Sequence, residues 1–195
     1  MKKDILENRT NLKEETGFAQ NNDGTFTNAL SVINGGHSLT LGNINLADIN
    51  GFMHTHPNDF LTGEIDPKTG QEKINLIYRI FSPADVIAFL KIAKASSNLS
   101  DVYATIITST GDYTLRFRGN INDITGLKTA SAYRTDYIKI MKKGKERGFL
   151  HFLKDHININ GIQLYKQHKP LFSNTIKIQH KTLKSYGKVQ TDDCE

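Results

Sequence analysis

Residues 49–57 read Ile-Asn-Gly-Phe-Met-His-Thr-His-Pro, and this stretch decides the fold that we expect. Its apolar residues favour a strand, and Pro57 ends that strand because proline has no amide hydrogen to donate to a sheet. In an extended strand, side chains two positions apart point to the same face. His54 and His56 can therefore present both imidazoles to one metal ion at the end of a strand.

A second stretch, Ser82-Pro83-Ala84-Asp85, predicts the start of a helix. Serine is a favoured N-cap residue, and proline suits the first helical position. Apolar residues then follow at helical spacing, at Val86, Ile87, Leu90 and Ala93. We expect this helix to end near residues 96–98. An acidic residue three positions after the N-cap is also an ordinary capping arrangement that needs no further function.

Short strands, turns and helices alternate along the rest of the chain. Residues 58–80 contain many polar, glycine and proline residues without a regular period, which predicts a long surface loop. The other predicted elements are hairpins over 15–32 and 102–117, a strand at 38–41, helices at 127–143 and 147–156 that are separated at Gly144, and strands at 162–165 and 175–178. We therefore expect an α/β fold with a mixed sheet flanked by helices.

Composition limits the kind of protein. With 195 residues, of which 37% are hydrophobic, the chain can bury the core of one domain. No apolar stretch approaches the roughly 20 residues that a bilayer span needs, so we expect no membrane span. The N-terminus has no apolar signal segment, which favours a cytoplasmic location or delivery without a classical signal peptide. The single cysteine, Cys194, excludes an internal disulfide and a cysteine-rich zinc site.

Charge is distributed unevenly. The chain carries a net charge of +5, and from Arg134 to Lys188 there are 13 Lys and Arg residues against Asp136, Glu146 and Asp155. A solvated lysine-rich face is the simplest interpretation, and an acidic protein partner is the alternative. Binding to nucleic acid is disfavoured, because zinc deaminases that act on nucleobases use a downstream Cys-x-x-Cys pair that this chain lacks.

Metal chemistry needs a third ligand beside the two histidines. Asp85 is the best placed candidate, because three protein ligands and an open water position are typical of catalytic zinc. The carboxylates of the 58–80 loop are alternatives, at Asp59, Glu64 and Asp66. Glu14 or Glu15, where the first strand begins, could act as general acid and base. Ser82 could donate a hydrogen bond to a developing oxyanion.

In order and residue type these motifs resemble the JAB/MPN (JAMM) zinc metalloproteases, over about residues 12–118. That family has an early Glu-x-x-Gly-apolar element, then His-x-His-Pro, then Ser-x-x-Asp; this sequence has Glu14 to Phe18, His54 to Pro57 and Ser82 to Asp85. The resemblance implies a cytidine-deaminase-like fold and Zn²⁺ bound by His54, His56 and Asp85. It also implies Glu14 as the acid/base and Ser82 as the oxyanion donor.

The resemblance also predicts the domain organisation. We expect a metallopeptidase core over residues 1–125 with an inserted loop at 58–80, and a basic α+β C-terminal extension over 126–195 packed on the same domain. The chain further resembles the JAB-like domains of bacterial polymorphic toxins, which implies an effector that cuts a peptide or isopeptide bond of a protein substrate. A catalytically silent binding or scaffold module with the same fold is the alternative.

Overall fold

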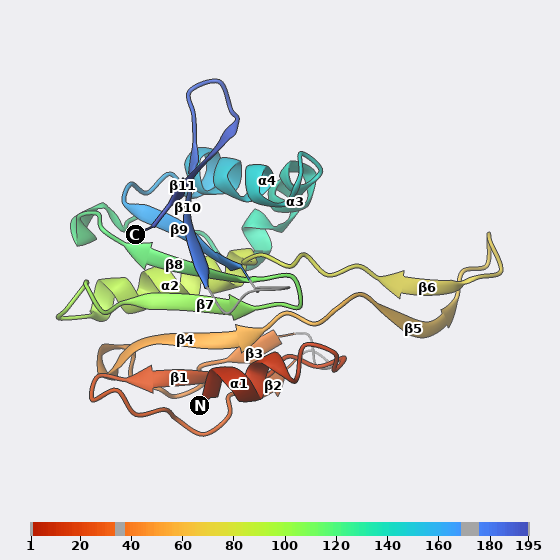
Figure 1. The fold of residues 1–195 in the computed structure, drawn as a ribbon, viewed down its shortest axis with the longest axis horizontal. Coiled ribbons are helices and arrows are strands. Elements are labelled where there is room, and N and C mark those ends of the chain that lie inside the picture. The colour runs from red at the N-terminus through yellow and green to blue at the C-terminus, as the bar shows by residue number, and fades with distance from the viewer. Residues whose placement is uncertain (1, 34–37, 169–175, 195) are drawn as a thin grey trace.

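A seven-stranded mixed sheet forms the centre of the protein (Figure 1). The computed structural model describes residues 2–33, 38–168 and 176–194. In spatial order the strands are β1 (Gly17–Asn21), β4 (Ile49–Thr55), β7 (Tyr103–Ile107), β8 (Asp112–Phe117), β9 (Ile162–His168), β10 (Lys177–Leu183) and β11 (Val189–Asp193). Only β4 and β7 pair in parallel; every other neighbouring pair in this sheet is antiparallel. The expected α/β class, with a mixed sheet and several helices, agrees with this arrangement.

Strand β4 separates two apolar layers. On one face Phe52 belongs to the main core, together with the buried side of α2 (Pro83–Ala95). On the other face Met53 packs against a smaller cluster that contains Leu6 of α1 (Lys2–Glu7). Because successive side chains of a strand point to opposite faces, His54 shares the face of Phe52 and is directed toward α2.

The parallel pair places α2 across the sheet. Parallel neighbours cannot be joined by a tight turn, so the chain leaves β4, crosses through α2 and returns as β7. Helix α2 begins where it was predicted, with Ser82 as N-cap in a capping box with Asp85, and ends at Ala95. Its apolar side is completely buried. The first turn of α2 therefore meets the carboxyl end of β4.

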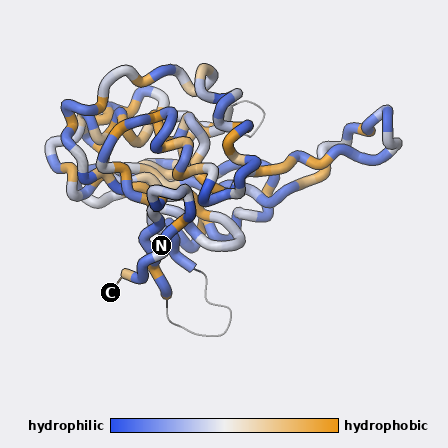
Figure 2. Tube along the Cα trace, turned by 90° about the horizontal axis from the view of Figure 1, so that it is seen from above, coloured by the Kyte–Doolittle hydropathy of each residue, from blue (hydrophilic) through white to orange (hydrophobic). Residues whose placement is uncertain are grey.

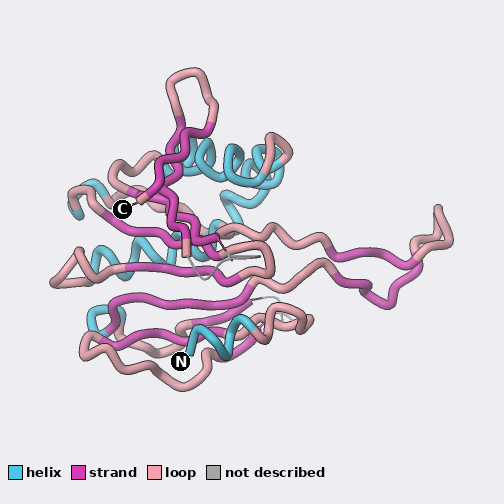
Figure 3. The backbone as a smooth tube through the Cα atoms, viewed as in Figure 1, coloured by secondary structure: helices cyan, strands magenta, loops and turns pink. Residues whose placement is uncertain are grey.

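Residues 58–80 differ from the prediction of an irregular loop. They contain an antiparallel hairpin of β5 (Phe60–Ile65) and β6 (Glu72–Asn75), which appears as strand in Figure 3. The hairpin projects from the body in Figure 1 and again in the view turned by 90° (Figure 2). Both of its faces are largely exposed, so its residues lack the apolar alternation by which a half-buried strand is recognised.

The predicted hairpin over 15–32 is correct only in part. Strand β1 pairs with β4, and the returning segment forms a single bridge between Gln20 and Phe26. A separate two-stranded sheet joins β2 (Ser31–Ile33) to β3 (Ser38–Thr40), which confirms a strand near 38–41. The predicted hairpin over 102–117 is confirmed by β7 and β8.

The C-terminal residues continue the central sheet, because β9 pairs with β8. Helices α3 (Ala130–Met141) and α4 (Lys145–Phe152) are separated at Gly144 as predicted. Both contribute aromatic residues to the main core, where Tyr137 lies edge-on to Phe152 at 5.1 Å between ring centroids. A π-helical turn, η4 (Leu153–Ile157), follows α4, and the 3₁₀ turns are η2 (Leu46–Asp48) and η3 (Ile121–Asp123). The sequence did not predict α1 or β11, and part of the strand predicted at 175–178 lies outside the described residues.

A charged cluster around Glu146 joins α4 to the C-terminal strands. The Glu146 carboxylate accepts hydrogen bonds from Tyr113 Oη at 2.8 Å and from Lys166 Nζ at 3.0 Å, and Lys181 Nζ lies 3.5 Å away. Burial alone would raise the pKa of Glu146, but these hydrogen bonds and charges outweigh it and lower that pKa. Two cations of the basic C-terminal third thus share one carboxylate within the protein.

No helix in the described part of the chain is both long enough and apolar enough to cross a membrane. The longest helices, α2 and α3, have 13 and 12 residues. The expectation of no membrane span agrees with this finding.

Removing core volume from the buried side of α2 should destabilise the protein. Leu90 is fully buried, so Leu90→Ala should lower the free energy of unfolding by about 2–5 kcal/mol. Ile138→Ala on α3 removes a 40% exposed side chain and should cost about 1 kcal/mol or less. Urea denaturation measures both. Equal losses would contradict the packing of α2 described above.

Stability should fall in acid partly through Glu146. Its pKa is lowered in the folded protein, whereas in the unfolded chain it lies near about 4.3. The stabilisation is therefore present above pH ~4.3 and is lost as the pH falls through the lower folded pKa. Glu146→Gln should lose less stability than the wild type between pH 6 and pH 3, as measured by denaturation at each pH. Parallel curves for the two proteins would show that the carboxylate contributes nothing.

Candidate metal centre

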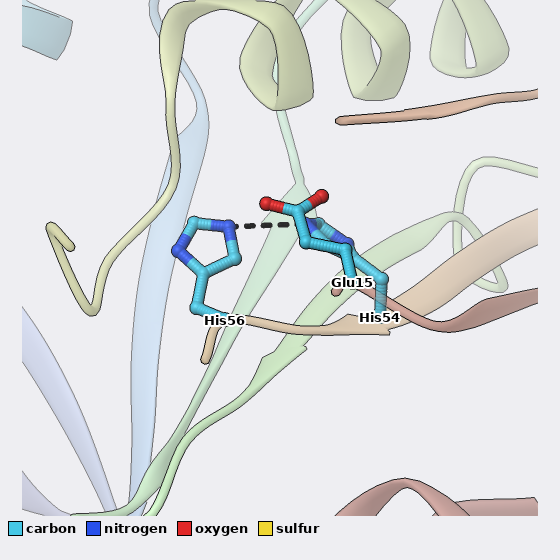
Figure 4. A group of neighbouring side chains, drawn as sticks. All are labelled: Glu15, His54 and His56. Atoms are coloured by element: carbon cyan, nitrogen blue, oxygen red, sulfur yellow. Dashed lines mark hydrogen bonds between the residues drawn. The ribbon is translucent and has the colours of Figure 1, made fainter. Parts of the chain in front are cut away.

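His54 and His56 lie together where β4 ends. Both are almost completely buried, and their Nε2 atoms are 3.0 Å apart. Figure 4 shows the two rings on the same side of the strand, with the Glu15 carboxylate beside them. The prediction that both imidazoles share one face is confirmed.

A backbone carbonyl orients the His56 ring. His56 Nδ1 lies 2.8 Å from the carbonyl oxygen of Tyr78. Because that oxygen can only accept, Nδ1 carries a hydrogen, and Nε2 is the atom that faces the centre. Tyr78 lies three residues after the end of β6, so the segment that leads from the hairpin back to α2 positions a predicted ligand. Sequence reasoning missed this contact because a backbone carbonyl leaves no signal in the side-chain pattern.

Asp85 combines the capping role with a place at the centre. Its Oδ2 accepts a hydrogen bond from the Ser82 amide at 2.7 Å, and Ser82 Oγ accepts from the Asp85 amide at 3.3 Å. The same carboxylate approaches the histidines, with Oδ1 3.4 Å from His54 Nε2 and Oδ2 3.6 Å from His56 Nε2. The capping box therefore holds Asp85 in the orientation in which it faces both rings.

Glu15, and not Glu14, lies beside the histidines. Glu15, His54 and His56 each offer a ligand atom within 4.8 Å of the others, a group that could hold a metal ion, whereas the Glu14 side chain is exposed. The resemblance implied Glu14, so the structure shifts the glutamate at this centre by one residue.

The pairing of β1 with β4 explains the shift. Gly17 lies opposite His54 in the β1–β4 register, and in an extended chain the side chain two positions earlier shares its side. A side chain at Gly17 would come within 2.7 Å of His54 Cβ, so glycine permits the close approach. Thr16 is held in line because its amide donates to Thr55 Oγ1 at 2.9 Å.

The loop carboxylates that were alternatives for the third ligand are engaged elsewhere. Asp59 pairs with Arg79 at 3.3 Å, Glu64 pairs with Lys73 at 2.9 Å, and Asp66 accepts from the Lys68 amide at 2.8 Å. Among the described residues, the group that could hold a metal ion is Glu15, His54 and His56, and none of the three loop carboxylates is in it. Asp85 is not in that group either, but its carboxylate lies within 3.6 Å of both histidines. The three loop carboxylates stabilise the hairpin and its base.

Burial and mutual charge shift the pKa values at the centre. Burial raises the pKa of Glu15 to about 7, although the charge of His56 opposes this. Burial lowers the pKa of His54. For His56, burial alone would lower the pKa, but the hydrogen bond and charge of Asp85 and the charge of Glu15 raise it. For Asp85, burial alone would raise the pKa, but the two histidines and the Ser82 amide hold it well below its usual range.

This donor set fits a divalent zinc ion. Two imidazole nitrogens and a carboxylate are characteristic zinc ligands, and the second carboxylate adds further negative charge. The carboxylates of this group are stabilised by a positive charge nearby. Either a proton on His56 Nε2 or a bound metal ion can supply that charge. The structure thus brings together His54, His56 and Asp85, the ligands expected from the sequence. Glu15 lies beside the two histidines, and Ser82 is hydrogen-bonded to Asp85.

A cavity of about 710 Å³ opens onto the centre. Glu15, His54 and Asp85 form part of its wall. Much of the remaining wall is apolar, formed by residues including Leu39, Leu41, Leu46, Phe52, Ile87 and Leu127. Volumes of a few hundred to a thousand Å³ are usual for ligand sites in proteins, so a ligand seated in this cavity can reach the candidate metal ligands.

Comparison of the chain with protein-family models, with the curated proteins and with the solved structures finds no match. The JAB/MPN resemblance of the sequence therefore stays a prediction. A function for this chain must be argued from the residues of the site and their arrangement.

Zinc content should depend on the predicted ligands. Purified wild-type protein should contain about one zinc ion per chain, and His54→Ala and Asp85→Asn should each lose most of it. Asp85→Asn keeps a side-chain oxygen for the helix cap, so its loss of zinc would not reflect an unfolded helix. His151→Ala, which removes a histidine paired with Asp155 away from the centre, should retain zinc. Elemental analysis measures all four proteins, and wild-type protein without zinc after reconstitution would contradict the site.

Proposed function

We propose that this chain is a zinc-dependent metallopeptidase that hydrolyses a peptide or isopeptide bond. One observation carries the proposal: His54, His56 and Asp85 converge, with histidine Nε2 atoms 3.0 Å apart and the carboxylate within 3.6 Å of each. Glu15 lies with the two histidines in a group that could hold a metal ion, and it lines the same cavity as His54 and Asp85. The order of these residues along the chain, which resembles the JAB/MPN pattern, supports the same chemistry.

Three side chains would hold the metal and two would assist the reaction. His54, His56 and Asp85 are the proposed ligands. A zinc ion bound by them would lower the pKa of a coordinated water to about 7 and polarise the carbonyl group that is attacked. Glu15 is then free to receive a proton from the attacking water and to deliver it to the leaving amine, because its carboxylate lies beside the ligands.

Ser82 is the proposed oxyanion donor. Its Oγ accepts the Asp85 amide hydrogen at the start of α2, and its own hydroxyl hydrogen can still be donated. A hydrogen bond to the carbonyl oxygen would strengthen as negative charge develops on that oxygen. The N-terminus of α2 adds a favourable electrostatic field at the same place.

A binding module without catalysis is the second candidate, and the projecting hairpin favours it. Large apolar side chains of this segment are exposed, including Leu61, Ile65, Ile74 and Leu76. Exposed apolar side chains that lie close together are typical of protein contact surfaces. Delivery of the chain as an effector, and binding of an acidic partner by its basic C-terminal third, also stay predictions.

Exchange of the two adjacent glutamates tests the proposed reaction. Glu15→Gln should reduce peptide hydrolysis by about 100-fold or more while zinc is retained, because the amide cannot accept the proton. Glu14→Gln is the matched control and should keep nearly full activity, since Glu14 is exposed and outside the cluster. Hydrolysis of a peptide library and metal content give the two readouts. Full activity in Glu15→Gln would contradict its role, and a zinc-loaded wild type that cleaves nothing would favour the binding module.

A further inference from the structure

We propose that the cavity beside the metal centre binds a large apolar side chain of the substrate, so that the protein cleaves next to a bulky apolar residue. This inference rests on the proposed function and names its substrate class. The observation behind it is the division of one cavity into a polar end, with Glu15, His54 and Asp85, and largely apolar walls.

The apolar walls come from several separate parts of the chain. Strand β3 and the residues after it contribute Leu39 and Leu41, and η2 contributes Leu46. Strand β4 contributes Phe52, helix α2 contributes Ile87 and the half-buried Ala88, and residues 127–130 at the start of α3 complete the wall. Because these parts all pack on the main core, the cavity is formed by the fold itself.

The wall residues are incompletely covered by the protein. Leu39, Leu41 and Leu46 pack against the core but are only half-buried, so part of each side chain faces the cavity. Filling the cavity with an apolar group removes this surface from water, which is favourable. A polar or charged group would instead lose hydration, with few partners on the apolar walls.

The charge of the cavity lining further restricts which side chain of the substrate can bind there. The lysines that line the cavity, Lys91 and Lys128, are both exposed. Their positive charge disfavours a basic side chain of the substrate at the same place. The apolar walls and these two lysines together therefore favour a bulky apolar residue over a basic one.

Size and position identify the occupant as part of the substrate. A cavity of about 710 Å³ holds one large side chain together with neighbouring backbone. His54 and Asp85, two proposed metal ligands, are themselves part of its wall. A side chain seated in the cavity therefore lies next to the bond that the centre would hydrolyse, where it can hold that bond in place.

Two cavity variants and a matched control test the proposal. Ala88→Trp fills the cavity from α2, and Ala95→Trp makes the same change at an exposed position at the end of α2. Leu41→Asp places a negative charge in the cavity wall, at a position outside any helix. It is the second test variant and replaces Ala88→Trp if that protein does not fold. Zinc content and thermal unfolding show that each variant is folded and loaded. None of these residues is a proposed ligand or catalytic group.

The experiment compares cleavage and binding by the zinc-loaded protein. Cleavage of a peptide library is sequenced, and peptides with Leu, Gly or Lys at the preferred position are then assayed singly. Ligand-observed NMR with the same peptides measures binding without cleavage. The wild type should prefer a bulky apolar residue beside the cleaved bond. Ala88→Trp should lower kcat/KM for the Leu peptide by about 10-fold or more while the Gly peptide changes little.

The controls and the outcomes separate the two proposals. Ala95→Trp should behave as the wild type, and Leu41→Asp should shift the preference toward the Lys peptide. Cleavage without an apolar preference, or an Ala88→Trp variant with unchanged preference, overturns this inference and leaves the peptidase proposal standing. Absence of cleavage with apolar-selective binding that Ala88→Trp abolishes overturns the peptidase and supports the cavity as an apolar binding site. Absence of both overturns both.

Discussion

The parallel pairing of β4 with β7 is the constraint on which the site depends. Two parallel neighbours require a crossover, and here the crossover ends in α2, which packs on one face of the sheet. The carboxyl end of β4 and the first turn of α2 are thereby brought together. Crevices at the carboxyl ends of strands are the usual ligand sites of open α/β sheets. His54 and His56 from β4 then face Asp85 from α2.

Electrostatics makes this meeting point unusual within the fold. Two almost completely buried imidazoles lie against two half-buried carboxylates, in a place where charge is poorly solvated. Asp85 keeps its charge because the Ser82 amide and the histidines stabilise it, whereas burial keeps the pKa of Glu15 near neutrality. Such a division between two neighbouring carboxylates is typical of sites in which one binds a cation and the other transfers a proton.

Hydrogen bonds at the base of the projecting hairpin connect it to the N-terminal segment and to the centre. On its outgoing side Asn58 donates its amide to Thr10 and its side chain to Asn11, which ties it to the N-terminal segment. On its returning side the Tyr78 carbonyl holds the His56 ring. A partner that bound the exposed apolar residues of the hairpin would therefore contact the same segment that holds the ring of His56, a proposed metal ligand. This geometry links the two candidate functions, because recognition at the hairpin and chemistry at the centre share one segment.

The sequence by itself determined the features that depend on neighbouring residues. The strand before Pro57, the helix after Ser82 and the common face of His54 and His56 follow from local capping and from the two-residue period of a strand. The tertiary structure decided which glutamate joins them, because that choice depends on the β1–β4 register and hence on Gly17. The tertiary structure also determined that residues 58–80 contain a hairpin, in which order the strands pair, and where the cavity lies. These arise from contacts between segments far apart in the chain, for which a single sequence carries no periodic signal.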